Sequence, residues 1–406
     1  MPYHSTGARR RNNYSFNGSG GHNRPRNNNA RRTNRGPAKQ YIDPAKFVQR
    51  ATAADAPEYQ ATHVFDDFAV EQLIKRNIKE LGYEVPTPIQ DQIIPLVLEG
   101  KDVIGIANTG TGKTAAFGVP ILSMLMTHRS NKVLIMAPTR ELAQQIEENF
   151  RSISRNCGLR SAVLIGGMGI GPQFRDLRAN PQIIIGTPGR IMDHIERGSL
   201  HMQHINKVVL DEVDRMLDMG FINDIRKILA MLPEQRQSMF FSATLDSKVN
   251  TLIQQAANDP VTVSVKTTSA SENVNQDVVT YGSKNEQLDK LHDLLTKTDV
   301  EKIIIFEETQ RNVDQLNKEL IARGFSADAI HGGKSQGQRR RALDKFKGNH
   351  VNILVATDVA ARGLDVKDIT HVVNYSLPQS YDDYIHRIGR AGRAGRIGHA
   401  YTFVSR

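Results

Sequence analysis

Residues 107–114 have the sequence A-N-T-G-T-G-K-T and come at the end of an apolar run at 102–107. Its two glycines let backbone N–H groups approach phosphates closely, and Lys113 can reach the β and γ phosphates of a nucleotide. Thr114 can help to hold Mg²⁺, and a helix that begins there adds its positive end. A strand before the loop and a helix after it are the context of a P-loop. The stretch therefore predicts an α/β domain that binds a nucleotide, rather than a simple glycine turn.

Outward from this loop, short apolar runs alternate with longer amphipathic segments. Continuous apolar runs of this length are typical of buried parallel strands. A first series of runs lies at 102–107, 132–137, 182–186, 207–210 and 238–241. Helical periodicity lies between them, as at 141–153 and 223–231. A second series lies at 302–306, 351–356 and 371–375.

The alternation predicts an α/β fold with two parallel-sheet domains in tandem. We expect the larger domain at 62–266 and the smaller at 277–406. The polar stretch 267–276 has few apolar residues and is predicted to be the linker between them. Residues 41–61 contain two prolines and are predicted to be a linker or a short helix.

The N-terminal segment 1–40 carries most of the net charge. It holds eight arginines and one lysine but no Asp or Glu, whereas the whole chain has a net charge of +10. The segment is rich in Asn and Gly and poor in apolar residues, so it cannot build a core and is predicted to be disordered. Such an arm suits contacts with nucleic-acid phosphates. A solubilising tail is the alternative.

Composition excludes several classes of protein. No stretch approaches the ~20 apolar residues of a membrane span, and no apolar N-terminal signal is present, so we expect no membrane partner. The one cysteine, Cys157, excludes an internal disulfide and a cysteine-based zinc cluster. These features favour a reducing, cytoplasmic location.

Polar motifs follow the apolar runs at the point where each run ends. D-E-V-D at 211–214 follows the run at 207–210; Asp211 suits Mg²⁺, and Glu212 suits a base that orients an attacking water. The others are A-P-T-R-E-L at 137–142, T-P-G-R at 187–190, S-A-T at 242–244 and A-T-D-V-A-A-R-G-L-D at 356–365. Open α/β sheets bind ligands at the carboxyl ends of their strands, so we expect these motifs to line a common site.

Two further motifs, G-Y-E-V-P-T-P-I-Q at 82–90 and H-R-I-G-R-A-G-R at 386–393, complete a set that resembles the DEAD-box RNA helicases of superfamily 2. The resemblance runs from about Phe65 to Val404, with the motifs in the family's order. It implies two RecA-like domains joined by a short linker. It also implies hydrolysis of ATP with Mg²⁺ and contacts with the RNA backbone that do not depend on base sequence.

The resemblance assigns a role to each matching position. Nucleotide binding is implied for Phe65, Tyr83, Gln90, Thr109, Gly110, Thr111, Gly112, Lys113, Thr114 and Asp365. Catalysis is implied for Lys113, Asp211, Glu212, Arg390 and Arg393. Mg²⁺ binding, partly through water, is implied for Thr114 and Asp211. Coupling of hydrolysis to domain closure is implied for Asp214, Ser242, Thr244 and His386. RNA binding is implied for Pro138, Thr139, Arg140, Gly166, Gly167, Thr187, Arg190, Gln336, Arg339 and Thr357.

The chemistry of these residue types suits the implied roles. The Gln90 amide both donates and accepts, as the N6 and N7 edge of adenine requires. Asp365 would face the ribose hydroxyls, and Arg390 and Arg393 would reach the γ-phosphate from the second domain. Arginine is always charged, and its fork pairs with phosphate oxygens.

The chain departs from the family pattern without losing a catalytic group. Val213 stands at the third position of D-E-A-D, Asn108 replaces a commoner Gln, and Ala391 replaces a commoner Thr or Ser. Ala107 stands where the usual P-loop has Gly. We therefore expect ATPase activity to survive.

Three interpretations stay open. The first is a helicase that separates short RNA duplexes or remodels RNA–protein complexes. The second is an ATP-gated RNA clamp or chaperone that seldom unwinds. The third is a DNA helicase or another P-loop ATPase, against which the adenine-reading segment 82–90 argues. The RNA, the oligomeric state and any partners in ribosome assembly or RNA decay are not identified, and no C-terminal specificity module is expected.

Overall fold

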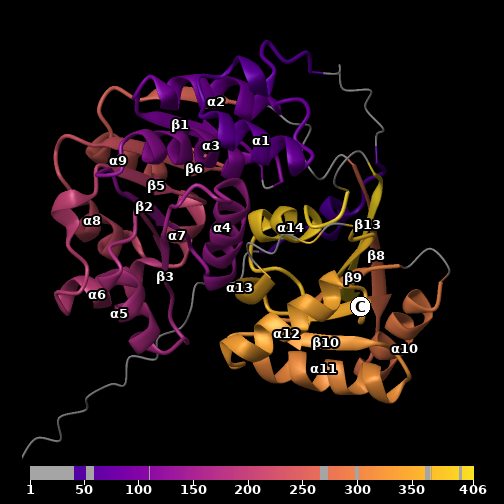
Figure 1. Cartoon of the computed structure of the whole chain (residues 1–406). Coiled ribbons are helices and arrows are strands. Elements are labelled where there is room, and N and C mark those ends of the chain that lie inside the picture. Colours follow the sequence, from indigo (N-terminus) through magenta and orange to yellow (C-terminus); the bar gives the residue numbers. More distant parts are fainter. Residues whose placement is uncertain are drawn as a thin grey trace, which may run out of the picture. The chain divides into compact units, whose positions relative to one another are not determined.

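The computed structural model describes residues 41–51, 59–108, 110–265, 273–297, 301–361, 366, 368–392 and 396–406. They form two α/β lobes, drawn from indigo to red-brown and from orange to yellow in Figure 1. The prediction of two parallel-sheet domains in tandem is confirmed. The arm at 1–40 and three predicted site residues, Thr109, Asp365 and Arg393, lie outside the described residues.

The first lobe is built on a sheet of seven parallel strands in the order β3-β4-β2-β5-β6-β1-β7. The strands are β1 (Val103–Ile106), β2 (Val133–Met136), β3 (Ser161–Leu164), β4 (Ile183–Gly186), β5 (Lys207–Leu210), β6 (Gln237–Ser242) and β7 (Val261–Ser264). All five predicted strands are present. The two that were not predicted, β3 and β7, are the edges of the sheet, where partly exposed positions interrupt the buried ones.

Helices cover both faces of this sheet because side chains alternate along each strand. Val133 and Ile135 lie in one core with α1 to α4, whereas Leu134 and Met136 lie in the other with α6 to α9. The helices are α1 (Gln72–Glu80), α2 (Pro88–Leu98), α3 (Lys113–Thr127), α4 (Arg140–Ile153), α5 (Ile170–Arg178), α6 (Pro188–Glu196), α7 (Val213–Asp218), α8 (Ile222–Ala230) and α9 (Ser247–Ala256), with short 3₁₀ turns η2 (Phe65–Asp67) and η3 (Met202–His204).

The second lobe has a sheet of six parallel strands in the order β10-β11-β9-β12-β13-β8. The strands are β8 (Val274–Tyr281), β9 (Ile303–Phe306), β10 (Ala327–Ile330), β11 (Ile353–Ala356), β12 (His371–Asn374) and β13 (Gly398–Ser405). The helices are α10 (Lys284–Leu295), α11 (Gln310–Ala322), α12 (Gln336–Lys347), α13 (Asp358–Ala361) and α14 (Tyr381–Ile388). The three predicted strands are β9, β11 and β12; β8, β10 and β13 were not predicted.

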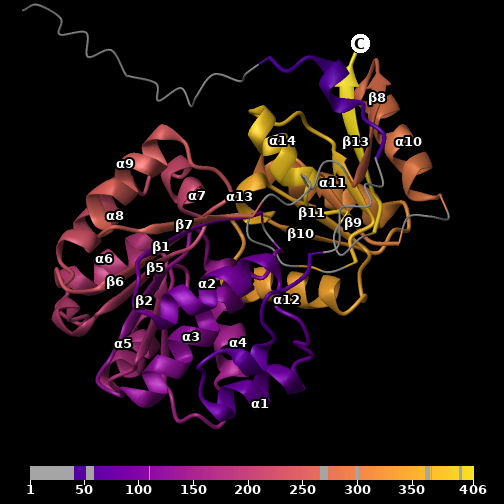
Figure 2. The same cartoon turned by 90° about the horizontal axis from the view of Figure 1, so that it is seen from above.

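Two segments, one predicted as a linker and the other as a linker or a short helix, contribute to the second lobe. The first three residues of β8, 274–276, belong to the stretch 267–276 that we expected to be linker. Residues 41–51, expected to be linker or helix, form a 3₁₀ turn, η1 (Pro44–Phe47), and then pair with β8 through Gln49. Figure 2 shows this indigo segment beside β8 and β13.

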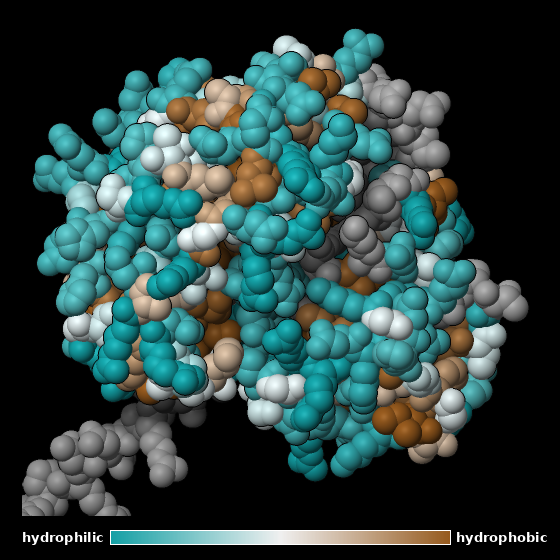
Figure 3. All heavy atoms as spheres, viewed as in Figure 1, coloured by the Kyte–Doolittle hydropathy of each residue, from teal (hydrophilic) through white to brown (hydrophobic). Residues whose placement is uncertain are grey.

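The outer surface is mainly hydrophilic, with apolar side chains in small separate groups on the face that Figure 3 shows. Among the described residues, no helix is both long enough and apolar enough to span a bilayer.

Candidate active site and nucleic-acid cleft

The phosphate loop connects β1 to α3. Lys113, the first residue of α3, is buried, and its Nζ donates a hydrogen bond to the carbonyl oxygen of Ala107 at 2.9 Å. Gly112 precedes it with a φ of 92°. A Cβ at Gly112 would collide with the Gln90 side-chain amide, so both the backbone angle and the space require glycine. The loop therefore presents Lys113 at the carboxyl end of the central strands, as predicted from its sequence.

Gln90 on α2 contacts this loop directly. Its Oε1 accepts a hydrogen bond from the Thr87 N–H at 2.9 Å, and its Nε2 donates to the Gly112 carbonyl at 3.2 Å. A primary amide has a second N–H and a second lone pair, so each end keeps capacity for one further partner. Nearby, the rings of Phe65 and Tyr83 meet edge-on with centroids 5.8 Å apart. The structure thus brings together the residues predicted to hold the base.

Asp91, the next residue on α2, was missed by the sequence reasoning. Its carboxylate accepts hydrogen bonds from the Tyr59 hydroxyl at 2.6 Å and the Thr62 N–H at 2.7 Å, and its Oδ1 lies 2.6 Å from His63 Nδ1. Burial acts to raise the pKa of Asp91, but these hydrogen bonds outweigh burial and hold the pKa below its usual value. Asp91 thereby fixes the segment that leads into Phe65.

Asp211 and Glu212 follow β5, and both are buried. Burial raises the pKa of Asp211 to about 6, against the opposing charge of Lys113. Glu212 has a φ of 53°, a left-handed backbone that is rare outside glycine. Neither carboxylate oxygen of Glu212 accepts a hydrogen bond from the described residues; its charge partner is the equally buried Arg215, with Nη1 3.3 Å from Oε2. A buried acceptor without a donor is costly, which is typical of a functional site.

Asp214 links this motif to the end of β6. Its Oδ2 accepts hydrogen bonds from the N–H groups of Ala243 and Thr244 at 3.0 and 3.1 Å, and from the Thr244 hydroxyl at 3.3 Å. Burial acts to raise the pKa of Asp214, but the Arg215 N–H and nearby positive charges outweigh it, so the pKa lies below its usual value. Ser242 is buried at the end of β6. The two segments predicted to couple hydrolysis to closure are therefore in direct contact.

In the second lobe, α14 ends with the first three residues of the motif predicted at 386–393. His386 is on the helix, and Arg390 is buried just beyond its end. Arg387, which sequence reasoning did not assign, pairs with Asp358 through two hydrogen bonds of 2.6 and 2.7 Å and donates to the Ser376 carbonyl at 2.7 Å. Arg387 therefore connects α14 to α13 through these hydrogen bonds.

A cleft of about 410 Å³ is lined by both lobes. Its walls include predicted RNA contacts Pro138, Thr139, Arg140, Gly166, Thr187, Arg190 and Arg339. Gly332 and Val359 of the second lobe also line it and were not predicted. Gly167 lies under the Arg140 guanidinium, where a Cβ would collide with Nη1. Of the predicted set, Thr357 is buried at the end of β11, and neither it nor Gln336 is among the lining residues.

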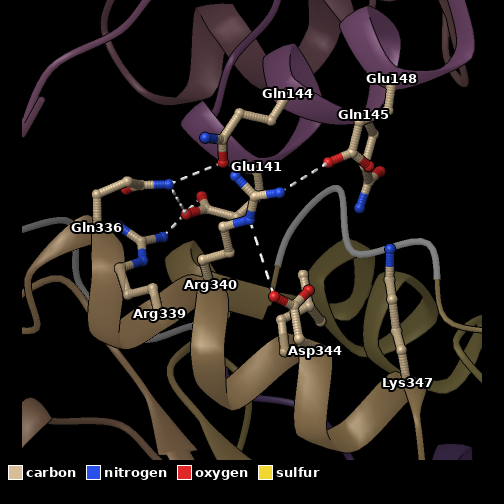
Figure 4. A pocket seen from close by; sticks show the side chains of 10 residues that line it. Glu141, Gln144, Gln145, Glu148, Gln336, Arg339, Arg340, Asp344 and Lys347 are labelled. Atoms are coloured by element: carbon tan, nitrogen blue, oxygen red, sulfur yellow. Dashed lines mark hydrogen bonds and ion pairs between the residues drawn. The ribbon is translucent and has the colours of Figure 1, made fainter.

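Beside the cleft, α12 contacts α4 (Figure 4). Arg339 Nη2 lies 2.7 Å from Glu141 Oε2, and both side chains are buried. Gln336 Nε2 donates to Gln144 Oε1 at 3.0 Å and to Glu141 Oε1 at 3.3 Å. The sequence reasoning assigned Gln336 and Arg339 to RNA but missed Glu141 and Gln144. These four side chains, the interlobe cluster, connect the two lobes.

Comparison with known proteins agrees with this geometry. Residues 87–252 match the DEAD/DEAH box helicase family, and residues 284–395 match the helicase conserved C-terminal domain. The chain is 45% identical over 342 residues to the ATP-dependent RNA helicase CshA of Limosilactobacillus reuteri, covering 84% of this chain and 69% of that protein. It is 46% identical over 343 residues to the DEAD-box ATP-dependent RNA helicase CshA of Geobacillus kaustophilus, covering 84% and 73%.

A solved structure shares the fold. Dbp5 of S. cerevisiae bound to RNA and ADP BeF3 is similar with a TM-score of 0.76 at 29% identity, covering 84% of this chain and 89% of that chain. The two parallel-sheet lobes are thus RecA-like domains in tandem, as predicted.

Proposed function

Because the chain belongs to the DEAD/DEAH box helicase family, we propose that it separates short RNA duplexes locally, or remodels RNA–protein complexes, as it hydrolyses ATP. The chain is an ATP-dependent RNA helicase. The observation that carries the proposal is the cleft, because arginines and backbone groups of both lobes line it. Such groups contact phosphates and carry no base code, so we expect binding that does not depend on RNA sequence.

The phosphate loop supplies the nucleotide site. Backbone N–H groups of Gly110 and Thr111 would hold phosphate oxygens, and Lys113 would exchange its hydrogen bond with Ala107 for the β and γ phosphates. Gln90 would use its remaining donor and acceptor on adenine while still bonded to Gly112. Base recognition and phosphate binding would thereby be linked through one side chain.

The residues present fit Mg²⁺. Thr114 and Asp211 offer a hydroxyl and a carboxylate, which are hard oxygen donors, and Mg²⁺ is usually bound through one or two carboxylates plus substrate phosphates. In the described part of the chain, no group of three or more His, Cys, Asp and Glu could hold a metal by itself, which agrees with such a shared site. When bound, the ion would neutralise charge on the phosphates.

Glu212 would orient and deprotonate the attacking water. Its oxygens receive no hydrogen bond from the described residues, so both can accept from water. Arg215, with Nη1 3.3 Å from Glu212 Oε2, would hold the side chain in place. The proton would pass to a Glu212 oxygen as the water oxygen bonds to the γ-phosphorus, while the bond from that phosphorus to the β–γ bridging oxygen breaks and ADP leaves.

Gln90→Ala should weaken ATP binding and reduce the preference for adenine over guanine nucleotides. Loss of a bidentate base contact is worth about 1–3 kcal/mol of discrimination. The structure adds a second effect, because the variant also loses the hydrogen bond to Gly112. Kd values for ATP and GTP measure both effects. Gln92→Ala, an exposed residue on the same helix, is the matched control; equal ATP and GTP selectivity in both variants would contradict the assignment.

Glu141→Gln should weaken the coupling between RNA and ATP. Removing one partner of a buried charge pair costs about 3–5 kcal/mol, because Arg339 is left uncompensated. We expect a higher RNA concentration for half-maximal ATPase activity. Glu148→Gln is the control, since its pair with Arg340 is exposed and 4.0 Å long, and such pairs contribute little. If the two variants behave alike, the interlobe cluster does not support closure.

The proposed function is tested by measuring strand displacement and phosphate release together on one short RNA duplex. We expect ATP-dependent separation and RNA-stimulated turnover. RNA-stimulated turnover without separation would instead identify a clamp, and equal stimulation by DNA would contradict an RNA-specific enzyme.

A further inference from the structure

The segment 42–51, here called the N-terminal strap, packs on α14. Phe47 is 1% exposed, and its ring lies 4.6 Å from the ring of Tyr384, which is fully buried. Ile42 and Ile388 contribute to the same apolar cluster, and Lys46 Nζ lies 5.6 Å from the centre of the Tyr381 ring. Phe47 is therefore buried against α14, a helix more than 300 residues further along the chain, and does not behave as part of a linker.

The strap also pairs with β8, which is an edge strand of the second sheet. Gln49 donates its N–H to the Gln276 carbonyl at 3.1 Å, and the Gln276 N–H returns a bond of 2.7 Å. The Ala51 N–H donates to Asn275 Oδ1 at 2.9 Å. The strap thus satisfies backbone groups that an edge strand otherwise leaves open.

Side-chain hydrogen bonds join these two contacts. Gln276 Oε1 accepts from the Tyr384 hydroxyl at 2.8 Å, and Gln276 Nε2 donates to Gln49 Oε1 at 3.3 Å. The strap, the edge strand and α14 are therefore one bonded unit. Further along α14, Arg387 donates two hydrogen bonds to the Asp358 carboxylate of α13. The helix is held between the strap and α13.

We propose that the N-terminal strap positions α14, with Phe47 as the positioning residue, so that the arginines following the helix meet the nucleotide on closure. The inference rests on the proposed function of those arginines. Tyr384 lies six residues before Arg390 in the sequence. A small rotation of α14 would therefore displace the Arg390 side chain. Misplacement of a catalytic group by about 1 Å is enough to cost 10²-fold in rate.

If the strap only covered the sheet edge, its loss would have a different effect. Such a cover would change the thermal stability of the protein but not its turnover well below the Tm. A positioning strap changes kcat at temperatures where the protein is fully folded. It leaves nucleotide affinity unchanged, because the phosphate loop and Gln90 belong to the first lobe.

Phe47→Ala in the full chain should lower RNA-saturated kcat by about 2- to 30-fold, the range reported for residues that modulate coupling without touching the ligand. The Kd for ATP should stay within about twofold of wild type, and Phe47→Leu should restore most of kcat because it refills the apolar site. Val48→Ala is the matched control, since Val48 is the next residue and is 56% exposed.

Gln49→Pro provides an independent test that removes no core side chain. Proline has no N–H to donate to Gln276, so the strap should detach from β8 and kcat should fall as in Phe47→Ala. Unchanged kcat in Gln49→Pro overturns the proposal, even if Phe47→Ala fails to fold. A wild-type protein without RNA-stimulated ATPase activity would instead overturn the proposed function itself.

Discussion

Glu212→Gln should reduce RNA-stimulated ATP hydrolysis by about 10²- to 10⁴-fold, the usual contribution of a general base. The amide keeps the shape of the side chain but accepts a proton far less readily than a carboxylate does. ATP-dependent RNA binding should persist, because Lys113 and Gln90 are unchanged. Phosphate release at saturating RNA measures the first effect, and a nucleotide-dependent RNA binding assay measures the second.

The same substitution should also lower the Tm, because Arg215 loses a buried partner of opposite charge. Glu234→Gln, an exposed carboxylate in the same lobe, controls for the change of charge. The ATPase comparison must be made well below both Tm values. Turnover near wild type would remove Glu212 from the role of base.

Arg393→Ala should lower kcat far more than it weakens ATP binding. An arginine that meets the γ-phosphate only after closure acts mainly on charge that develops in the transition state. Arginine fingers contribute about 10³- to 10⁵-fold in rate, and we expect the lower end or less because Arg390 shares the charge. Nucleotide Kd and RNA-saturated kcat should be measured on the same preparation.

Arg396→Ala is the matched control for this variant. Arg396 is three residues further along, is exposed and pairs with Asp368 at 2.8 Å, so its loss should leave kcat unchanged. If Arg393→Ala lost ATP affinity but kept kcat, Arg393 would be a simple binding residue. The proposed site shared between two lobes would then be wrong.

The central strands could be predicted from the sequence because they are buried on both faces and are continuously apolar. Runs such as 132–137 and 351–356 contain β2 and β11, each buried along its whole length. The missed strands β3, β7, β8 and β10 are sheet edges, and β13 lies beside one. There, alternating exposure weakens the apolar signal.

The site residues could be predicted only where they belong to one short sequence motif. The phosphate loop and the carboxylates of 211–214 are short motifs whose geometry follows from the strands before them. The partners of Glu141 and Asp91 could not be predicted in this way. Gln336 lies 195 residues from Glu141 in the chain, and nothing in the spacing of either motif indicates the contact. Such pairings are set by how helices pack, not by local pattern.

The pairing of Gln49 with Gln276 has a consequence for how the chain is made. The two residues are 227 positions apart, and synthesis proceeds at about 5–20 residues per second, so the ribosome needs about 10–45 s to supply the partner. The second sheet itself is incomplete until β13 emerges, because β13 lies between β8 and β12. The first described segment to be synthesised is thus among the last to find its place. Throughout that interval Phe47 is an exposed apolar side chain on a nascent chain, within reach of chaperones.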